Sequence, residues 1–274
     1  MKNLFVTITF AVLTINAEAQ TTTASQTERP IVPFEDNSFL LAEAYNQEAG
    51  VVQHIAMVER GENNAMDASF TEEWPLGSQR HQLSYTIPLV RAEGTGSGLG
   101  LGDIELEYRL QAWGIGESRL AMAPSVTLSL PSGRNDRGHG SYGIGVGLPV
   151  SYAISPTLVT HTNVGVVHIP GARAVDGRAA NAEYSIGQSV IYKAYPQAHL
   201  MLESLWTGGD SDSFVISPGV RFALNFKSGL QIVPGIAVPY ETRGGGSTSY
   251  LFYLSIEHPF AHPRPNARYP SPIR

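Results

Sequence analysis

Residues 142–154 read YGIGVGLPVSYAI, and every second residue from Tyr142 to Ile154 is bulky and apolar. The residues between them are glycine, proline, serine or alanine. Successive side chains of a β-strand point to opposite faces, so this stretch predicts a strand with one continuous apolar face. Segments of roughly ten residues with this alternation are typical of closed barrels that cross a lipid bilayer.

Other stretches repeat the alternation and place charge on the second face. In residues 101–112 the apolar face carries Ile104, Leu106, Tyr108 and Leu110. The opposite face carries Asp103, Glu105, Glu107, Arg109 and Gln111. Residues 214–226 likewise set an apolar face against Ser217, Arg221 and Asn225. Faces with so many polar side chains are expected to line a wet interior.

Segments with period two can be counted along the chain after residue 50. Twelve are found, at 51–61, 65–76, 81–91, 101–113, 118–130, 141–154, 157–169, 181–195, 197–207, 213–226, 229–240 and 248–260. Short turns between them alternate with longer glycine-rich connections such as 92–100 and 131–140. A lipocalin-like barrel or a jelly roll needs no such asymmetry. The sequence therefore predicts an all-β fold, a twelve-stranded antiparallel transmembrane β-barrel.

The composition favours a surface that faces lipid and argues against several kinds of partner. Charged residues make up 15% of the chain, roughly half the share of a soluble surface. The net charge of −6 argues against nucleic acid. The chain has no cysteine, and its histidines are scattered, so we expect neither a metal site nor a cofactor.

The N-terminus has the pattern of a secretory signal peptide. Lys2 precedes an apolar run from Leu4 to Ile15, and Ala17-Glu18-Ala19 supplies small residues for cleavage before Gln20. The apolar run is too short to span a bilayer as a helix. We therefore expect residues 1–19 to be removed on export to the outer membrane of a Gram-negative bacterium.

The rest of the chain divides into an N-terminal segment (20–50), a barrel (51–260) and a proline-rich tail (261–274) that we expect to be disordered. The last strand ends at Phe260 and looks like the aromatic-ended closing strand of bacterial barrels. Outer-membrane lipid and the barrel-assembly machinery are the partners expected of such a chain.

The segment before the barrel is predicted to enter it. Asp36 or Asn37 could cap a short helix that stops before Gly50. Its apolar side chains need cover, so we expect a helical or extended plug inside the lumen; the alternative is an ordinary first strand. The expected plug residues are Phe39, Glu43, Tyr45, Asn46 and Gln47. On a helix, Glu43 and Gln47 are one turn apart and could reach inward polar groups such as Arg109 or Arg221.

The charged residues predicted to face inward are candidates for selectivity. They are Asp103, Glu105, Glu107, Arg109, Glu203 and Arg221. Such charges could bias which solutes pass, or could neutralise one another in a plugged interior. Tyr45 and Met201 are the inward candidates for contact with an apolar solute.

His139-Gly140-Ser141 raises the alternative of an outer-membrane enzyme of phospholipase type. Residues two apart on a strand share a face, as a Ser–His pair requires. The apolar stripe that starts at Tyr142 puts both residues on the inward set, however, whereas that enzyme works at its lipid-facing surface. We therefore predict no catalytic residues. The glycine-rich stretch 94–102 precedes a strand instead of a helix, unlike a phosphate-binding loop.

Pro124, Pro218 and Pro234 fall inside expected strands. A proline cannot donate a hydrogen bond to the strand ladder, so we expect each to mark a bulge, a rim position or a neighbour's unpaired carbonyl.

Several motifs of the mature chain occur together in a known family. They are Asp36-Asn37-Ser38-Phe39-Leu40, Glu43-Ala44-Tyr45-Asn46-Gln47-Glu48, Val51-Val52-Gln53-His54, Glu73-Trp74-Pro75, His81-Gln82-Leu83-Ser84-Tyr85 and Gly100-Leu101-Gly102-Asp103. In these motifs the chain resembles the transporter family named for the MetA-pathway of phenol degradation. Leu41-Ala42 stand where a second acidic residue is common in that family, which alters the charge of the plug.

The resemblance covers nearly the whole mature chain and implies an outer-membrane barrel. It suggests the passage of aromatic or other hydrophobic compounds, and it assigns no catalytic residues. We therefore expect a channel or transporter for passive uptake of small hydrophobic or aromatic molecules. The alternatives are the phospholipase-type enzyme and a structural barrel without transport.

Overall fold

A computed structural model gives the structure of the protein, and it describes residues 38–91, 98–115, 118–133, 137–171, 182–209, 212–243 and 246–260. The predicted signal peptide and the predicted disordered tail lie outside these ranges. All described residues belong to one compact unit. Within them, no helix is long and apolar enough to cross a membrane.

The described residues form seventeen strands in one sheet and a short 3-10 helix, η1 (Glu62–Asn64). The strands of the first half are β1 (Val51–Arg60), β2 (Met66–Pro75), β3 (His81–Arg91), β4 (Gly100–Leu101), β5 (Ile104–Leu110), β6 (Leu120–Met122), β7 (Ser125–Leu130) and β8 (Gly143–Ser155). Those of the second half are β9 (Leu158–His168), β10 (Ala182–Lys193), β11 (Ala198–Gly208), β12 (Ser213–Phe222), β13 (Leu224–Asn225), β14 (Gln231–Ala237), β15 (Tyr240–Glu241), β16 (Ser247–Thr248) and β17 (Tyr250–Pro259).

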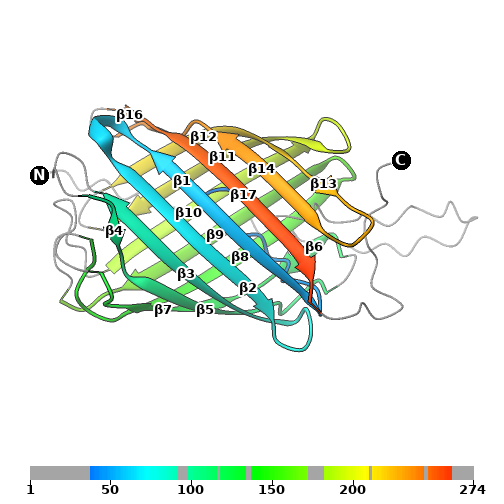
Figure 1. Ribbon diagram of the computed structural model, residues 1–274, viewed down its shortest axis with the longest axis horizontal. Helices are drawn as coiled ribbons and strands as arrows, with labels where there is room; N and C mark the ends of the chain where they lie inside the picture. Colours follow the sequence, from blue (N-terminus) through cyan, green and yellow to red (C-terminus); the bar gives the residue numbers. More distant parts are fainter. Residues whose placement is uncertain are drawn as a thin grey trace, which may run out of the picture. The chain divides into compact units, whose positions relative to one another are not determined.

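The strands close into a barrel. Neighbouring strands are antiparallel, and β1 pairs with β17 from Val51↔Pro259 to Arg60↔Tyr250, so the first and last strands lie side by side (Figure 1). The short strands β4, β6, β13, β15 and β16 continue or precede a longer neighbour in the same span, which leaves twelve spans. The prediction of a twelve-stranded antiparallel barrel is confirmed.

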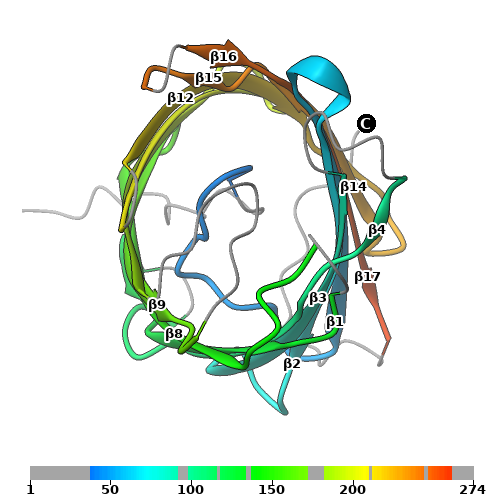
Figure 2. The ribbon, with the colours of Figure 1, turned by 90° about the vertical axis from the view of Figure 1, so that its left-hand side faces the viewer.

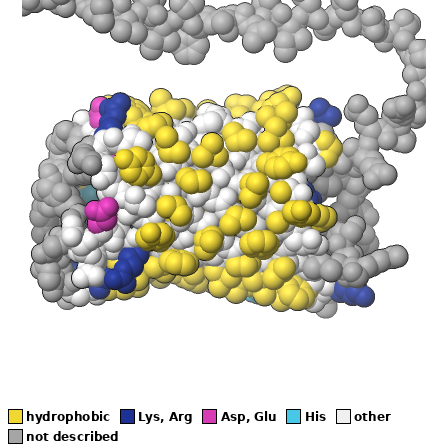
Figure 3. Space-filling model, turned by 90° about the horizontal axis from the view of Figure 1, so that it is seen from above, with side chains coloured by type: hydrophobic (Ala, Val, Ile, Leu, Met, Phe, Trp, Pro, Cys, Tyr) yellow, Lys and Arg dark blue, Asp and Glu magenta, His cyan; other side chains and the backbone are white. Residues whose placement is uncertain are grey.

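The outer surface is apolar, as the period-two pattern predicts. In β8 the outward side chains of Ile144, Val146 and Tyr152 are about half exposed, and glycines or small residues alternate with them on the inner face. Figure 3 shows hydrophobic side chains spread over the visible outer face, with charged side chains toward its two ends. Such a surface is suited to a hydrocarbon layer bounded by polar interfaces.

The three prolines lie where the sheet is interrupted. Pro124 separates β6 from β7, and its carbonyl accepts a hydrogen bond from Leu110 N–H at 3.0 Å. Pro218 lies beside the break between β14 and β15 and accepts from Val238 N–H at 3.0 Å. Pro234 lies beside the break between β12 and β13. The missing donors therefore coincide with gaps in the neighbouring strand, and the pairings of Pro218 with β11 and of Pro234 with β17 run without a bulge.

The interior of the barrel contains the start of the described chain. Figure 2 looks along the barrel and shows the segment before β1 inside the ring of strands. Residues 38–47 are called the luminal segment below. Most of their side chains are buried, although none of these residues is in a helix or strand. Of the two expected forms of this segment, helical or extended, the described residues show no helix.

Candidate functional site

Side chains of the barrel wall bind the main chain of the luminal segment. The carboxylate of Glu203 accepts hydrogen bonds from the N–H groups of Phe39 at 3.2 Å and Leu40 at 3.0 Å. The amide of Asn163 accepts from Ala42 N–H at 2.9 Å and donates to Ala42 C=O at 2.8 Å. These contacts come from β11 and β9, so the segment begins on one side of the lumen.

The same kind of contact continues toward the opposite wall. The N–H of Ala44 donates to Ser151 Oγ at 2.8 Å, and Asn46 N–H donates to Gln111 Oε1 at 3.0 Å. The N–H of Gln47 donates to Gln82 Oε1 at 2.8 Å. In a helix, these N–H groups would donate to the carbonyls four residues back. Here they donate to side chains of the wall instead. This is the physical reason why the segment is not helical.

Apolar side chains of the luminal segment fit against glycines of the wall. The ring of Phe39 is buried, and its centroid lies 4.9 Å from that of Tyr253 with a tilt of 45°. A Cβ at Gly219 would lie 2.9 Å from this ring, and one at Gly235 would overlap it. A Cβ at Gly187 would overlap Leu41. Because glycine has no side chain, the wall can approach both residues closely.

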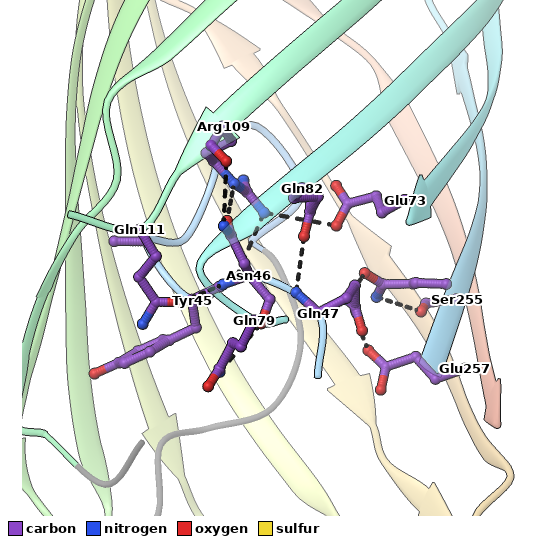
Figure 4. A network of polar contacts seen from close by, with 12 residues as sticks. Tyr45, Asn46, Gln47, Glu73, Gln79, Gln82, Arg109, Gln111, Ser255 and Glu257 are labelled. Carbon is purple, nitrogen blue, oxygen red and sulfur yellow. Dashed lines mark hydrogen bonds and ion pairs between the residues drawn. The ribbon is translucent and has the colours of Figure 1, made fainter. Parts of the chain in front are cut away.

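A polar network surrounds the end of the luminal segment (Figure 4). Arg109 Nε donates to Asn46 Oδ1 at 2.8 Å, and Asn46 Nδ2 donates to the carbonyl of Arg109 at 3.3 Å. The guanidinium of Arg109 also forms an ion pair with Glu73 at 3.6 Å. Gln47 Nε2 donates to Gln53 and, at 3.5 Å, to Glu257. The described hydrogen bonds of Arg109 to the luminal segment go to Asn46 and to the carbonyl of Tyr45, and none of them goes to Gln47.

Tyr45 is buried beside small wall residues, in a cluster with Ala44, Ala121 and Ala123. Its hydroxyl donates to the carbonyl of Ser118 at 3.2 Å. Burial raises the pKa of this hydroxyl above its ordinary value, and the negative charge of Glu43 adds to the effect. Tyr45 therefore stays neutral at physiological pH and acts as an apolar body with one polar contact.

A row of buried polar residues crosses five neighbouring strands of the wall. In register order they are Ser151, His161, Ser189, Glu203 and Ser217, and each is 0% exposed. Within the row, Ser151 Oγ and His161 Nδ1 lie 2.7 Å apart. Ser189 Oγ lies 2.8 Å from Ser38 Oγ, so three of the five residues bind the luminal segment. Of this row, only Glu203 was predicted as a site residue.

The residues predicted to line the lumen divide into two groups. Arg109, Glu203 and Arg221 are nearly fully buried, and Arg221 Nε donates to His199 at 3.2 Å. Glu105 and Glu107 are further along β5 and are less buried, and Thr127 donates to Glu107 at 3.4 Å. The first group therefore belongs to the part of the wall near the luminal segment, and no described hydrogen bond joins the second group to that segment.

Asp103 has a different environment from the other predicted lumen residues. It lies between β4 and β5, and its carboxylate accepts hydrogen bonds from the N–H groups of Gly133 at 2.8 Å and His139 at 2.6 Å. Both donors belong to the connection between β7 and β8. Asp103 thus holds this connection against the end of β5.

His139 and Ser141 lie in the same connection, before β8 begins at Gly143. The strand alternation that would place both side chains on one face therefore does not apply to them. Among the residues that the structure describes, no three His, Asp or Glu side chains are grouped as a metal ion would require.

Several solved structures have a similar fold. An outer-membrane channel from Pseudomonas putida F1 matches with a TM-score of 0.59 and 12% identity, covering 79% of this chain and 97% of that one. The KdgM porin matches with a TM-score of 0.54 and 11% identity, covering 76% and 99%. The NanC porin matches with a TM-score of 0.54 and 11% identity, covering 74% and 98%. The fold is that of outer-membrane β-barrel channels.

The family follows from the sequence. Residues 37–253 match the family described as "Putative MetA-pathway of phenol degradation", and the chain belongs to this family. The resemblance in the motifs of the mature chain is thereby confirmed. A search of curated proteins finds no match.

Proposed function

We propose that the protein is an outer-membrane channel for passive uptake of small hydrophobic or aromatic molecules, and that the luminal segment restricts the path. The observation that carries this proposal is the segment itself, held across the interior by the side chains of Glu203, Asn163, Ser151, Gln111 and Gln82. A barrel that only filled space would not need a separate chain segment bound to its wall. The family description supports hydrophobic or aromatic solutes.

We propose two roles for the predicted site residues. Phe39, Glu43, Tyr45, Asn46 and Gln47 form the restriction together with Arg109, Glu203 and Arg221. Glu105 and Glu107 act on solutes before they meet it, because carboxylates along a wet wall favour cations over anions. Asp103 contributes indirectly through the connection that it holds.

The experiment that tests this proposal uses purified protein in planar bilayers and liposomes. Deleting residues 36–48 removes the contacts at Glu203, Asn163, Ser151 and Gln111 and is expected to raise single-channel conductance. Uptake of phenol into liposomes should rise in parallel. Heat-modifiable gel migration checks that the deleted protein still forms a barrel.

The possible results separate the candidate functions. A folded deletion protein with unchanged conductance would place the restriction elsewhere. Absence of solute uptake by both proteins would favour a structural barrel. Calcium-dependent phospholipase activity that is lost on Ser141→Ala would replace the channel by an enzyme.

A further inference from the structure

The contact site of Phe39 is shaped for an aromatic ring. We call it the Phe39 site, and it consists of Gly219, Gly235 and Tyr253, which approach the ring, within one cluster of buried apolar residues. Other strand residues of that cluster are Val159, Ile191, Met201, Val233, Ala237 and Leu251. They come from β9, β10, β11, β14 and β17, so the site is built on the rigid wall and not on a loop.

The two glycines determine the size of the Phe39 site. A Cβ at Gly235 would overlap the Phe39 ring, and a Cβ at Gly219 would lie 2.9 Å from it, closer than ordinary van der Waals contact. The ring therefore occupies space that any side chain at these positions would fill. Tyr253 approaches at 4.9 Å with a tilt of 45°, which is within the range of favourable aromatic pairs.

Phe39 is held at one end of the luminal segment, apart from the other anchors. The N–H groups of Phe39 and Leu40 share the single acceptor Glu203. Ser38, just before Phe39, contacts Ser189 through its hydroxyl at 2.8 Å, and the following part of the segment has its own partners, with Ala42 on Asn163 and Ala44 on Ser151. Displacing the Phe39 side chain therefore disturbs the contacts at Glu203 and Ser189 and does not require those of residues 42–47 to break.

We propose that the Phe39 site is a binding site for one monocyclic aromatic ring, and that a solute reaches it by displacing the side chain of Phe39. Phe39 then acts as an internal ligand of the site in the empty channel. This inference rests on the proposed function, because it names a solute class and a point of contact for the channel. Displacement of Phe39 would also let the solute change the position of the luminal segment that restricts the path.

The first experiment measures binding of toluene by calorimetry to purified protein in detergent. Phe39→Ala vacates the site and is expected to bind toluene roughly tenfold more tightly than the wild type, since a vacated apolar site can take up a ring of that size. Adding Gly235→Val to Phe39→Ala fills the site and should abolish the gain. Adding Gly145→Val is the matched control, because Gly145 is an inward glycine of β8 whose Cβ would contact Val167 and Thr127 and not Phe39. That protein should bind toluene as Phe39→Ala does.

The second experiment detects displacement in an otherwise wild-type protein. The chain has no cysteine, so Leu40→Cys and Ala44→Cys each introduce a single thiol. Saturating toluene should accelerate alkylation of the thiol at position 40 about fivefold or more. The thiol at position 44 should react at an unchanged slow rate, because Ala44 is fully buried and has a separate anchor.

Either of two results would overturn the inference. One is equal toluene binding by Phe39→Ala with and without Gly235→Val. The other is alkylation at position 40 that toluene does not change. The first experiment measures equilibrium binding, the second measures the accessibility of a thiol, and neither measures flux. A protein that binds toluene as expected but conducts nothing would therefore contradict the proposed function and leave the binding site standing.

Discussion

Glu203 shows how a single inward carboxylate can hold a segment that forms neither helix nor strand. It is fully buried in the wall, yet its two oxygens accept hydrogen bonds from two consecutive N–H groups, those of Leu40 and Phe39. An intramolecular hydrogen bond typically contributes about 0.5–1.5 kcal/mol net to stability, so the two bonds together hold the start of the segment. The inward position of Glu203 follows from strand alternation, whereas its partners lie more than a hundred and sixty residues earlier in the sequence.

Replacing Glu203 should release the start of the luminal segment. Glu203→Ala removes both acceptors, so we expect alkylation of a thiol at Leu40→Cys to rise roughly tenfold or more, which corresponds to about 1.4 kcal/mol. Glu203→Gln keeps one acceptor oxygen and should have a smaller effect. Ser217→Ala changes the next residue of the same row, for which no bond to the segment is described, and serves as the control. Equal alkylation rates in all three proteins would contradict the assigned role of Glu203.

Gly187 offers a test of the close packing around Leu41. Gly187→Ala adds a Cβ that overlaps Leu41, so we expect weaker binding of the segment, by about 1–3 kcal/mol. Hydrogen exchange of the amides of residues 40–44, followed by mass spectrometry, should become faster. Leu41→Ala in the same protein should restore slow exchange. Gly147→Ala, whose Cβ would meet only Ser125 Oγ at 3.0 Å, is expected to leave exchange unchanged.

At the scale of the elements, the strands and the luminal segment differ in how far the sequence predicts them. Each strand carries its own pattern, because lipid on one side and a wet lumen on the other enforce alternation along every span. The luminal segment has good helix formers, but its N–H groups bind Asn163, Ser151 and Gln111 on distant strands. Local sequence does not contain those partners, so it cannot decide between the helical and the extended form of the segment.

The sequence also predicts some residues of the candidate site and not others. Arg109, Glu203 and Arg221 were identified because charge at an inward position stands out. Ser151 and Gln82 were missed because a small or neutral polar side chain at such a position is ordinary. Asp103 has the inward parity of its strand, but it lies in the gap before β5 and binds the backbone of another connection. The alternation of inward and outward side chains holds along a continuous strand and fails at its ends.

Asp103 should control the order of the connection between β7 and β8. Asp103→Ala removes two hydrogen bonds to the N–H groups of Gly133 and His139, so we expect trypsin to cleave after Arg137 roughly tenfold faster. Glu105→Ala changes the next inward carboxylate, which has no described bond to this connection, and should leave the rate of cleavage unchanged. Similar cleavage rates for the two variants would show that Asp103 does not hold the connection.

At the scale of the whole molecule, closure of the barrel and its apolar outer face determine what the protein needs in order to fold. The pairing of β1 with β17 leaves no strand edge unpaired along the seam, and the apolar outer face needs lipid or detergent. Figure 1 shows the two strands aligned over their length. The first and last spans must both be present before the barrel can close, so folding is expected to finish only after the whole barrel sequence is available.

Export and assembly can be tested together in cells. We expect cleavage before Gln20, recovery in the outer-membrane fraction, and faster gel migration of the unheated protein than of the heated one, because a closed barrel resists unfolding by detergent. The N-terminal sequence of the purified protein and its migration provide the measurements. A soluble periplasmic protein would contradict membrane insertion and revive the lipocalin-like alternative.

The barrel wall contacts the luminal segment in two ways, and each way places a different constraint on sequence change. The described hydrogen bonds of Asn163 go to the main chain of Ala42, a partly buried residue. Replacing the side chain of Ala42 therefore preserves both hydrogen bonds. The side chain of Leu41 packs against the backbone of Gly187. A larger residue at position 187 would therefore require a smaller one at position 41. Among descendants of this gene, position 42 should drift freely, while positions 41 and 187 should change as a pair.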